Sequence, residues 1–324
     1  MTTILSINNK GKAMGYQQTD LSLAESITKS ASRQTYYTIR FLADRERAID
    51  AYRAYAYFRW VDDILDADLG SGSERSAFIQ RQKSLLESCY RGEIVQNARI
   101  EEQMLVDLIR GDTEKNSGLQ SYCRNMMSVM VFDANRRGRI VSQTELSEYT
   151  RLLATAVMEA MHYFIGHHCY SPQNEMRYLA VSAAHITHML RDTFDDLQAG
   201  YYNIPREILE TNRIAPQDIN SNTYRAWVRS RVQLARTYLK AGKKYLSQVE
   251  NLRCRVAGFA YSARFEWLLD TIERENYCLR PHYNERKSFG TGLQMSWITL
   301  SSLYDWLAVG APLQTVPVRQ RSAR

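Results

Sequence analysis

The sequence predicts an all-α protein with a single helical domain, and three observations support that fold class. The chain has only 15 glycines and 6 prolines among its 324 residues. This is about half of the usual share, whereas all-β sandwiches and barrels need these residues in frequent turns. Apolar residues recur at helical spacing from about Leu21 to Leu307. Hydrophobic residues make up 44% of the chain, which is enough for a large core and argues against a disordered protein.

The predicted elements follow one another without a linker or an internal repeat. Residues 1–20 are polar and are expected to form a flexible N-terminus, with no apolar segment typical of a secretion signal. Residues 21–310 are expected to form a domain of about ten helices, and residues 311–324 a basic tail. Short breaks separate the helices. These breaks lie at 70–73, 111–112, 137–139, 171–172, 200–205 and 212–216.

The charge balance of 42 basic against 35 acidic side chains gives a net charge of +7, which suits an anionic partner. Phosphorylated metabolites, membrane headgroups and nucleic acid are all compatible with it, as is a basic surface that only keeps the protein soluble. The five cysteines form no CxxC pair, so we expect reduced thiols in a cytoplasmic protein. The tryptophan-containing segment 293–312 is too polar to span a membrane, but with the basic tail it is compatible with peripheral membrane contact.

The first acidic cluster lies near the end of a predicted helix that starts after Asp44, its expected N-cap, and stops after Asp66. At ~100° per residue, Asp62 and Asp66 lie ~40° apart, with Arg59 on the same side. One such pair is weak evidence, because carboxylates four residues apart are common on solvated helix faces.

A second cluster occupies the predicted helix over 173–200. His185, His188, Asp192 and Asp196 span only about 80° of its circumference, so ionisable groups replace an apolar face. Like charges at this spacing destabilise an isolated helix by a few tenths of a kcal/mol. Because the chain repeats the arrangement, we expect bound divalent cations to relieve the repulsion.

Carboxylates on two facing helices predict a site for Mg²⁺ and a diphosphate. Mg²⁺ is typically held by one or two carboxylates while phosphate oxygens and water complete its shell. Arg59 and Arg191 lie beside these acids, and either bind diphosphate oxygens or pair with the acids. Loss of an allylic diphosphate leaves a carbocation, which aromatic faces stabilise.

Three runs of the sequence carry a resemblance to a known family. They are 30–37 (SASRQTYY), 57–66 (YFRWVDDILD) and 190–196 (LRDTFDD), the last followed by Ile204-Pro205. With weaker similarity in between, the chain resembles the squalene/phytoene synthase family over about residues 30–287.

This resemblance implies an all-α class I isoprenoid synthase fold, Mg²⁺ as the cofactor, an allylic prenyl diphosphate as the substrate and no nucleic-acid partner. The positions that it implies for metal binding are Asp62, Asp66, Asp192 and Asp196. The positions that it implies on the diphosphate side are Ser30, Ser32, Arg59 and Arg191. It also implies that Tyr149 lies in the catalytic cavity.

The chain departs from the family around the expected cavity. His185 and His188 replace a glutamine and an asparagine that usually precede the second acidic motif. Met158 stands where relatives often keep glycine, and Phe265 stands where a tyrosine is common, so both are expected to shape the substrate pocket. Residues 201–203 (Tyr-Tyr-Asn) replace the usual Arg-Ile-Tyr.

A narrowed cavity suits one prenyl chain and a small acceptor better than two prenyl chains. An imidazole can take up a proton near neutral pH, which prenyl transfer to an aromatic ring requires. We therefore predict a Mg²⁺-dependent prenyltransferase of secondary metabolism that acts on a small aromatic acceptor, similar to the phytoene-synthase-like aromatic prenyltransferases. Its predicted catalytic residues are His188 or His185 as the base, and Tyr149.

Other interpretations stay open. The chain is also compatible with head-to-head synthesis of squalene or phytoene, with cyclisation of one prenyl diphosphate, and with a catalytically dead relative that serves in assembly. The two histidines are explained equally by hydrogen bonds to a neighbouring helix or to metal-bound water. Together with Asp192 and Asp196 they could also form a transition-metal site.

Overall fold

The computed structural model describes residues 21–67 and 72–283, which contain helices and no strand, so the predicted all-α class is confirmed. Residues 21–31 are helical. The elements that follow are α2 (Arg33–Leu42), α3 (Ala48–Asp66), α4 (Gly72–Tyr90), α5 (Ile100–Arg110), α6 (Gly118–Arg136), α7 (Gln143–Phe164), the 3₁₀ turn η1 (Glu175–Tyr178), α8 (Leu179–Arg191), α9 (Thr193–Gln198), α10 (Arg206–Asn212), α11 (Asn222–Gln248) and α12 (Leu252–Arg274).

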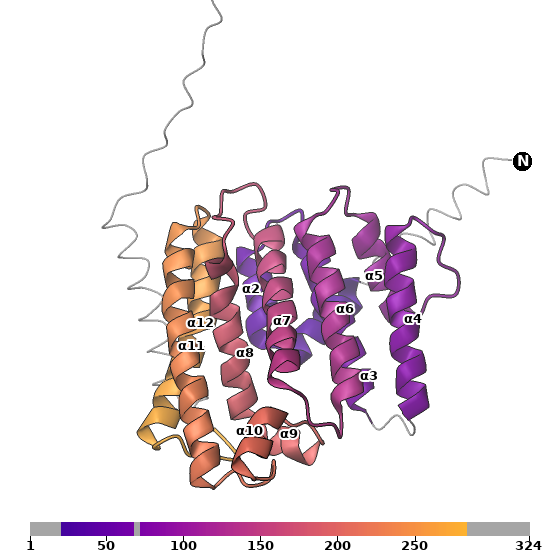
Figure 1. Cartoon of the computed structure of the whole chain (residues 1–324). Helices are drawn as coiled ribbons and strands as arrows, with labels where there is room; N and C mark the ends of the chain where they lie inside the picture. The colour runs from indigo at the N-terminus through magenta and orange to yellow at the C-terminus, as the bar shows by residue number, and fades with distance from the viewer. Residues whose placement is uncertain (1–20, 68–71, 284–324) are drawn as a thin grey trace, which may run out of the picture.

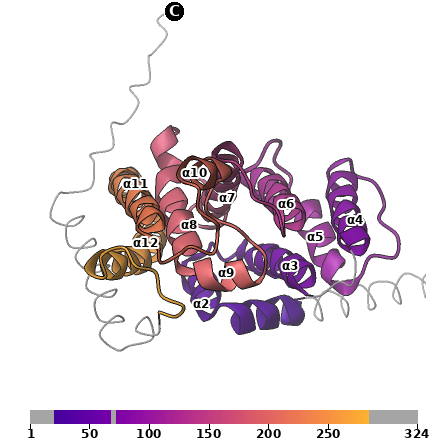
Figure 2. The same ribbon diagram turned by 60° about the horizontal axis from the view of Figure 1, so that its bottom comes forward.

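The long helices pack in layers. Helices α6, α7, α8 and α11 form a row in which each contacts the next, and α2, α3 and α5 lie behind it (Figure 1). The short helices α9 and α10 lie at the lower end of the row in Figure 1. Figure 2 looks from that end and shows α9 beside α3. The arrangement therefore brings the second acidic motif to the end of the bundle where the first one lies.

Buried apolar side chains form two main clusters in the described residues. The larger one holds α3, α5, α6 and α7 together, and the second joins α8, α11 and α12. No helix within 21–67 and 72–283 combines the length and apolarity that a membrane span requires. The predicted N-terminus 1–20, the segment 293–312 and the basic tail 311–324 lie outside these residues.

The expectation that Asp44 caps the helix of the first acidic motif is wrong. Helix α3 begins three residues after its expected start, with Arg47 at the N-cap. The Asp44 carboxylate instead accepts hydrogen bonds from the backbone N–H groups of Gly166 (2.9 Å) and His167 (3.1 Å). Gly166 has a φ of +73°, which glycine adopts without strain. Asp44 thus satisfies backbone donors exposed just after α7 ends at Phe164.

The continuous helix expected over 173–200 is also wrong, because it is divided. Helix α8 ends at Arg191 and α9 begins at Thr193. Between them Asp192 has a φ of −92° and a ψ of 5°. The Thr193 hydroxyl donates to the carbonyl oxygens of Met189 (2.9 Å) and Leu190 (3.1 Å), a type of bond that bends helices. Asp192 and Asp196 therefore lie on either side of a break.

A close backbone approach sets the spacing of α8 and α11. A Cβ added at Gly242 would lie 2.5 Å from the Ala180 nitrogen. Overpacking of this kind costs about 1–3 kcal/mol, so we expect Gly242→Ala to lower the free energy of unfolding by at least that amount in urea. At Gly72 an added Cβ meets no atom within 4 Å. Gly72→Ala is therefore the control, and equal stability of the two variants would contradict the prediction.

Candidate active site

The end of α3 carries the first carboxylates of the site. Arg59 donates to the carboxylates of Asp62 (3.3 Å) and Asp63. The pKa of Asp62 is raised to about 7, first because burial disfavours the charged form and then because Asp66 repels it. Burial also raises the pKa of Asp66, with Asp63 adding to the effect. The two carboxylates predicted from their spacing therefore share one partly buried, repulsive environment.

Helix α6 adds a carboxylate and a guanidinium that the sequence analysis does not single out. Arg136 is 7% exposed; its Nε donates to Asp133 (2.7 Å) and a terminal nitrogen donates to the Asn203 side-chain oxygen (3.0 Å). Its guanidinium lies over the rings of Tyr149 and Tyr201, at 5.0 and 4.8 Å. The Tyr149 hydroxyl donates to Asp133 (2.9 Å). Tyr149, a predicted cavity residue, is thus held next to Arg136 by a carboxylate that the sequence analysis does not single out.

The segment around α9 supplies the facing carboxylates. The Asn203 amide donates to Asp196 at 2.5 Å. The pKa of Asp196 is raised to about 6, mainly by burial, with repulsion from Asp192 and Asp133 adding to the effect. Asp192 itself is held by both arms of the Arg191 guanidinium, at 2.5 and 2.6 Å. The bidentate pair aligns Asp192. The carboxylates of the site form an acidic wall that consists of Asp62, Asp66, Asp133, Asp192 and Asp196.

Asp133 lies between the two predicted motifs. Its carboxylate helps to raise the pKa of Asp62 and of Asp196, and Asp66 helps to raise the pKa of Asp133 in turn. Charges influence one another in this way only at short range through a poorly solvated region. The structure therefore brings the two motifs together around a third carboxylate.

The donor set of this acidic wall fits Mg²⁺. Its groups are carboxylates, and their mutual repulsion would be relieved by a cation. Within 21–67 and 72–283, no three Asp, Glu, His or Cys side chains converge closely enough to hold an ion alone. Mg²⁺ does not need such a cage, because it commonly takes one or two carboxylates and completes its shell with water and phosphate. Asp62 and Asp66 on one side and Asp192 and Asp196 on the other are the residues that could hold it.

His185 is a buried, neutral imidazole. It is 8% exposed and stands edge-on to Tyr149, with ring centroids 4.8 Å apart. The pKa of His185 is lowered to about 3, first by burial and then by the charges of Arg136 and Arg231. Its buried Nε2 makes no hydrogen bond in the described part of the chain. This environment disfavours the protonated form, so His185 is poorly suited to hold a proton.

His188 lies in a different, half-buried environment. Arg264 donates to its Nε2 at 3.3 Å and also to the Gln34 side chain at 2.7 Å. Because a guanidinium only donates hydrogen bonds, Nε2 is the acceptor and Nδ1 carries the ring proton. The imidazole also packs on Phe265, with ring centroids 4.9 Å apart. The structure thus joins the predicted residues His188 and Phe265, and adds Arg264 as a partner.

The remaining predicted residues lie at different places. Ser32 caps α2 by accepting from the Thr35 backbone at 3.2 Å, and it also bonds to Tyr55, whose ring hydroxyl interacts with Arg59 and Asp62. Ser30 is exposed and its hydroxyl donates to a main-chain oxygen one turn earlier (3.0 Å). Met158 is 1% exposed within the larger core cluster. Ser32 is therefore linked to the acidic wall, whereas no described contact links Ser30 to it.

The chain is similar to known proteins both in sequence and in fold. Residues 28–289 match the sequence profile of the squalene/phytoene synthase family. The structure is similar to that of a dehydrosqualene synthase in complex with a ligand, with a TM-score of 0.68, 18% identity, and coverage of 89% of this chain and 98% of the other. It is also similar to squalene synthase HpnC from Alicyclobacillus acidocaldarius, with a TM-score of 0.64, 17% identity, and coverage of 83% and 100%. No curated protein sequence matches the chain significantly.

Proposed function

Since the chain belongs to the squalene/phytoene synthase family, whose members are prenyltransferases that use prenyl diphosphates, we propose that it ionises an allylic prenyl diphosphate in the presence of Mg²⁺ and transfers the prenyl group to a small aromatic acceptor. The observation that supports ionisation of the diphosphate is the acidic wall, in which Asp133 helps to raise the pKa of Asp62 on one side and of Asp196 on the other. We assign the reaction to secondary metabolism.

The acidic wall is suited to receive a diphosphate. Bound Mg²⁺ would neutralise the diphosphate and make it a better leaving group. The guanidinium groups of Arg59 and Arg191 lie beside the carboxylates at 3.3 and 2.5 Å. Once these carboxylates are engaged by a cation, the two arginines are left to donate to the diphosphate oxygens, which carry the developing charge.

Aromatic rings border the same region and suit a carbocation. Tyr149 stacks on Phe132 with centroids 4.7 Å apart, and Phe265 contacts Tyr261 at 5.1 Å. Ring faces attract cations within about 6 Å of their centroids. They also exclude water, which would otherwise capture the cation.

His188 is the better candidate for the base that removes the acceptor's proton. The buried environment that lowers the pKa of His185 to about 3 makes that imidazole a weak base. His188 is half-buried beside Phe265 and keeps its Nε2 as a hydrogen-bond acceptor. Proton uptake at Nε2 requires Arg264 to give up this bond, and its second partner, Gln34, can retain the guanidinium.

The buried Met158 supports a single prenyl chain. Met158 is 1% exposed in the larger core cluster. Its side chain therefore fills space inside the bundle that a glycine at this position would leave open. Head-to-head joining of two prenyl diphosphates is the alternative, and family membership is equally consistent with it. Cyclisation of one prenyl diphosphate is a third possibility.

The acceptor assay separates these reactions. The protein is incubated with Mg²⁺ and dimethylallyl, geranyl, farnesyl or geranylgeranyl diphosphate, with and without phenolic and indolic acceptors and a small-molecule extract of the producing cell. We expect diphosphate release and prenylated product only when an acceptor is present. A C30 or C40 hydrocarbon made from prenyl diphosphate alone would overturn the aromatic acceptor, and a cyclised product would indicate the third reaction. An absence of diphosphate release throughout would contradict the proposed activity altogether.

The two histidines are distinguished by variants assayed with the active acceptor. We expect His188→Gln to lower kcat about 10²-fold or more, the lower range for loss of a general base. His185→Gln should keep kcat within about tenfold of the wild type, because its imidazole is a weak base. A larger loss of kcat in His185→Gln than in His188→Gln would refute the choice of His188.

A further inference from the structure

Helix α2 carries two aromatic rings on its outward face. Tyr37 is 49% exposed and Phe41 is 67% exposed, and their rings stack with centroids 6.0 Å apart. On the opposite side of the helix Ile39 is buried in the larger core cluster, and α2 packs on α3 and α12. Figure 2 shows α2 at the margin of the bundle, beside α3. A contiguous apolar patch that polar side chains surround typically marks a surface that contacts a protein or a membrane.

Two arginines lie on the same side of α2 as the rings. At ~100° per residue, Arg33, Tyr37, Arg40 and Phe41 fall within about 100° of the circumference of the helix. These four residues are called the α2 face below. Both arginines are exposed. Residues 29–45 contain one acidic residue, Asp44, and it is buried. The α2 face therefore combines aromatic rings with an uncompensated positive charge.

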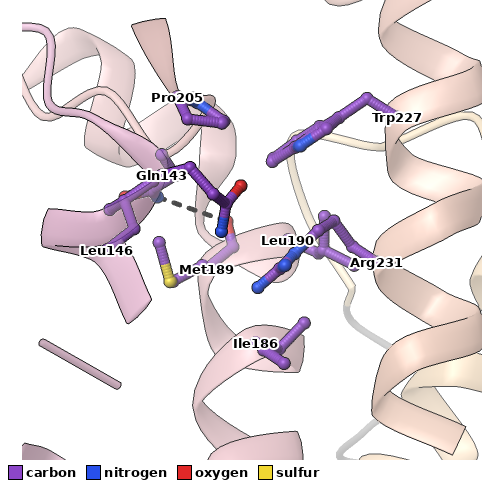
Figure 3. Close-up of a pocket in the computed structure, with 9 residues that line it drawn as sticks. Gln143, Leu146, Ile186, Met189, Leu190, Pro205, Trp227 and Arg231 are labelled. Carbon is purple, nitrogen blue, oxygen red and sulfur yellow. Dashed lines mark hydrogen bonds between the residues drawn. The ribbon is translucent and has the colours of Figure 1, made fainter. Parts of the chain in front are cut away.

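Other arginines of the bundle lie against protein groups, in contrast to those of the α2 face. Arg136 is 7% exposed and donates to Asp133 at 2.7 Å. Arg231 points from α11 into a small cavity beside α8 (Figure 3). Within 21–67 and 72–283, no hydrogen bond or ion pair engages the side chain of Arg33 or Arg40. Both guanidinium groups are therefore available to an anionic partner.

The start of α2 connects its exposed face to the candidate active site. Ser32, the N-cap of α2, bonds to Tyr55, whose hydroxyl interacts with Asp62 of the acidic wall. Gln34, in the first turn, accepts a hydrogen bond from Arg264 at 2.7 Å, and the same guanidinium donates to the proposed base. A partner bound at the α2 face would therefore lie next to the site.

We propose that the α2 face docks on the surface of a membrane that contains anionic phospholipids. Arg33 and Arg40 lie against the headgroup phosphates. Tyr37 and Phe41 enter the boundary between headgroups and acyl chains, where aromatic side chains are enriched. The net charge of +7 draws the protein toward such a surface. This contact is distinct from the one that the sequence permits for 293–312 and the basic tail, which lie outside the described residues.

The size of the α2 face favours a lipid surface over a protein partner. A stable protein interface takes about 800 Å² from each side, whereas α2 has 10 residues and is about 15 Å long. A lipid surface needs no matching shape, and each basic side chain near an anionic leaflet strengthens binding about fivefold. Prenyl chains dissolve in the same layer, so docking would bring the site close to its proposed substrate. The binding itself does not depend on the proposed function.

Vesicle binding tests the contact. The full-length protein is sedimented with vesicles of phosphatidylcholine alone or mixed equally with phosphatidylglycerol, without prenyl substrate, so that the result is independent of catalysis. We expect binding to the anionic vesicles, and at least about tenfold weaker binding to the neutral ones. Binding to the anionic vesicles should weaken at high salt, because salt screens exposed charges. Equal binding to both kinds of vesicle, or binding to neither, would overturn the proposal.

Variants assign the binding to the α2 face. Arg33→Gln combined with Arg40→Gln should weaken binding to anionic vesicles at least about tenfold, and Phe41→Ser should weaken it without changing the net charge. The control combines Arg213→Gln and Arg229→Gln, which removes the same charge from exposed positions after α10 and on α11. Equal losses in the two double variants would refute the site. An oligomer that Phe41→Ser dissociates would instead identify a second copy as the partner and overturn membrane docking.

Discussion

Asp62→Asn and Asp196→Asn are each expected to lower the rate of diphosphate release by at least about 10³-fold, which corresponds to ~4 kcal/mol of transition-state stabilisation. The reason is that each asparagine keeps the shape of the side chain and removes the charge that a Mg²⁺ ion would bind. Release of inorganic diphosphate from the prenyl substrate that proves active is the measurement. Asp192→Asn should lose activity in the same way.

The neighbouring acid Asp195 provides the control. It lies on the exposed side of α9, next to Asp196, so Asp195→Asn changes the net charge of the protein equally without touching the acidic wall. We expect it to retain most of the wild-type rate. Wild-type rates in both Asp62→Asn and Asp192→Asn would refute the assignment of the metal-binding residues.

Asp62→Asn should raise the stability of the protein although it lowers the activity. The pKa of Asp62 is raised because burial and the nearby carboxylates make its charged form unfavourable. In metal-free protein at pH 8, where that form dominates, Asp62→Asn should therefore raise the free energy of unfolding. A variant that is inactive but more stable than the wild type cannot owe its inactivity to misfolding. This pattern is expected where a functional site keeps repelling charges close together at the expense of stability.

Arg136→Met is expected to be the most destabilising of the proposed substitutions, with a loss of about 3–5 kcal/mol in the free energy of unfolding. The variant would leave Asp133 buried without its counter-charge and would remove the bond to Asn203. It would also remove the cation from the faces of Tyr149 and Tyr201. Urea unfolding followed by circular dichroism measures the effect.

Arg151→Met is the matched control for Arg136→Met. Arg151 also pairs with an acid three residues away, Glu148, but its side chain is 60% exposed. Exposed pairs contribute ~0–1 kcal/mol, so this variant should unfold within about 1 kcal/mol of the wild type. Equal unfolding midpoints for the two variants would show that the buried network around Arg136 carries no special stability.

The sequence predicted the features that are local. Asp62 and Asp66 are four residues apart on one helix, so their shared face follows from helical geometry alone. The helical class follows from apolar spacing and from the shortage of glycine and proline, and this class is confirmed for the described residues. The single-domain organisation and the roles of the site residues stay predictions.

The site residues that sequence reasoning missed are joined by contacts between distant segments. Arg136 and Asn203 are 67 residues apart along the chain, and no spacing rule connects them. A weak signal was available, because an Asp three residues before an Arg in an otherwise apolar helical stretch predicts a pair on one face. That signal indicates the pair of Asp133 and Arg136, but it cannot tell whether the pair is buried.

The wrong prediction that Asp44 caps a helix has the same explanation. Its carboxylate bonds to backbone groups more than 120 residues later in the chain, whereas a cap is recognised from the residues that follow directly. A polar residue before a helical stretch is therefore compatible with both uses. Only the packing of α7 against the α2–α3 connection decides between them.

The contact at Gly242 has a consequence for how this protein can change over evolutionary time. Because the main chain of α8 at Ala180 lies directly against α11 at Gly242, the start of α8 has little room to shift when side chains further along the helix change. In the proposed reaction, substitutions at His185 and His188 would then alter the acceptor side of the site while the start of the helix stays in place.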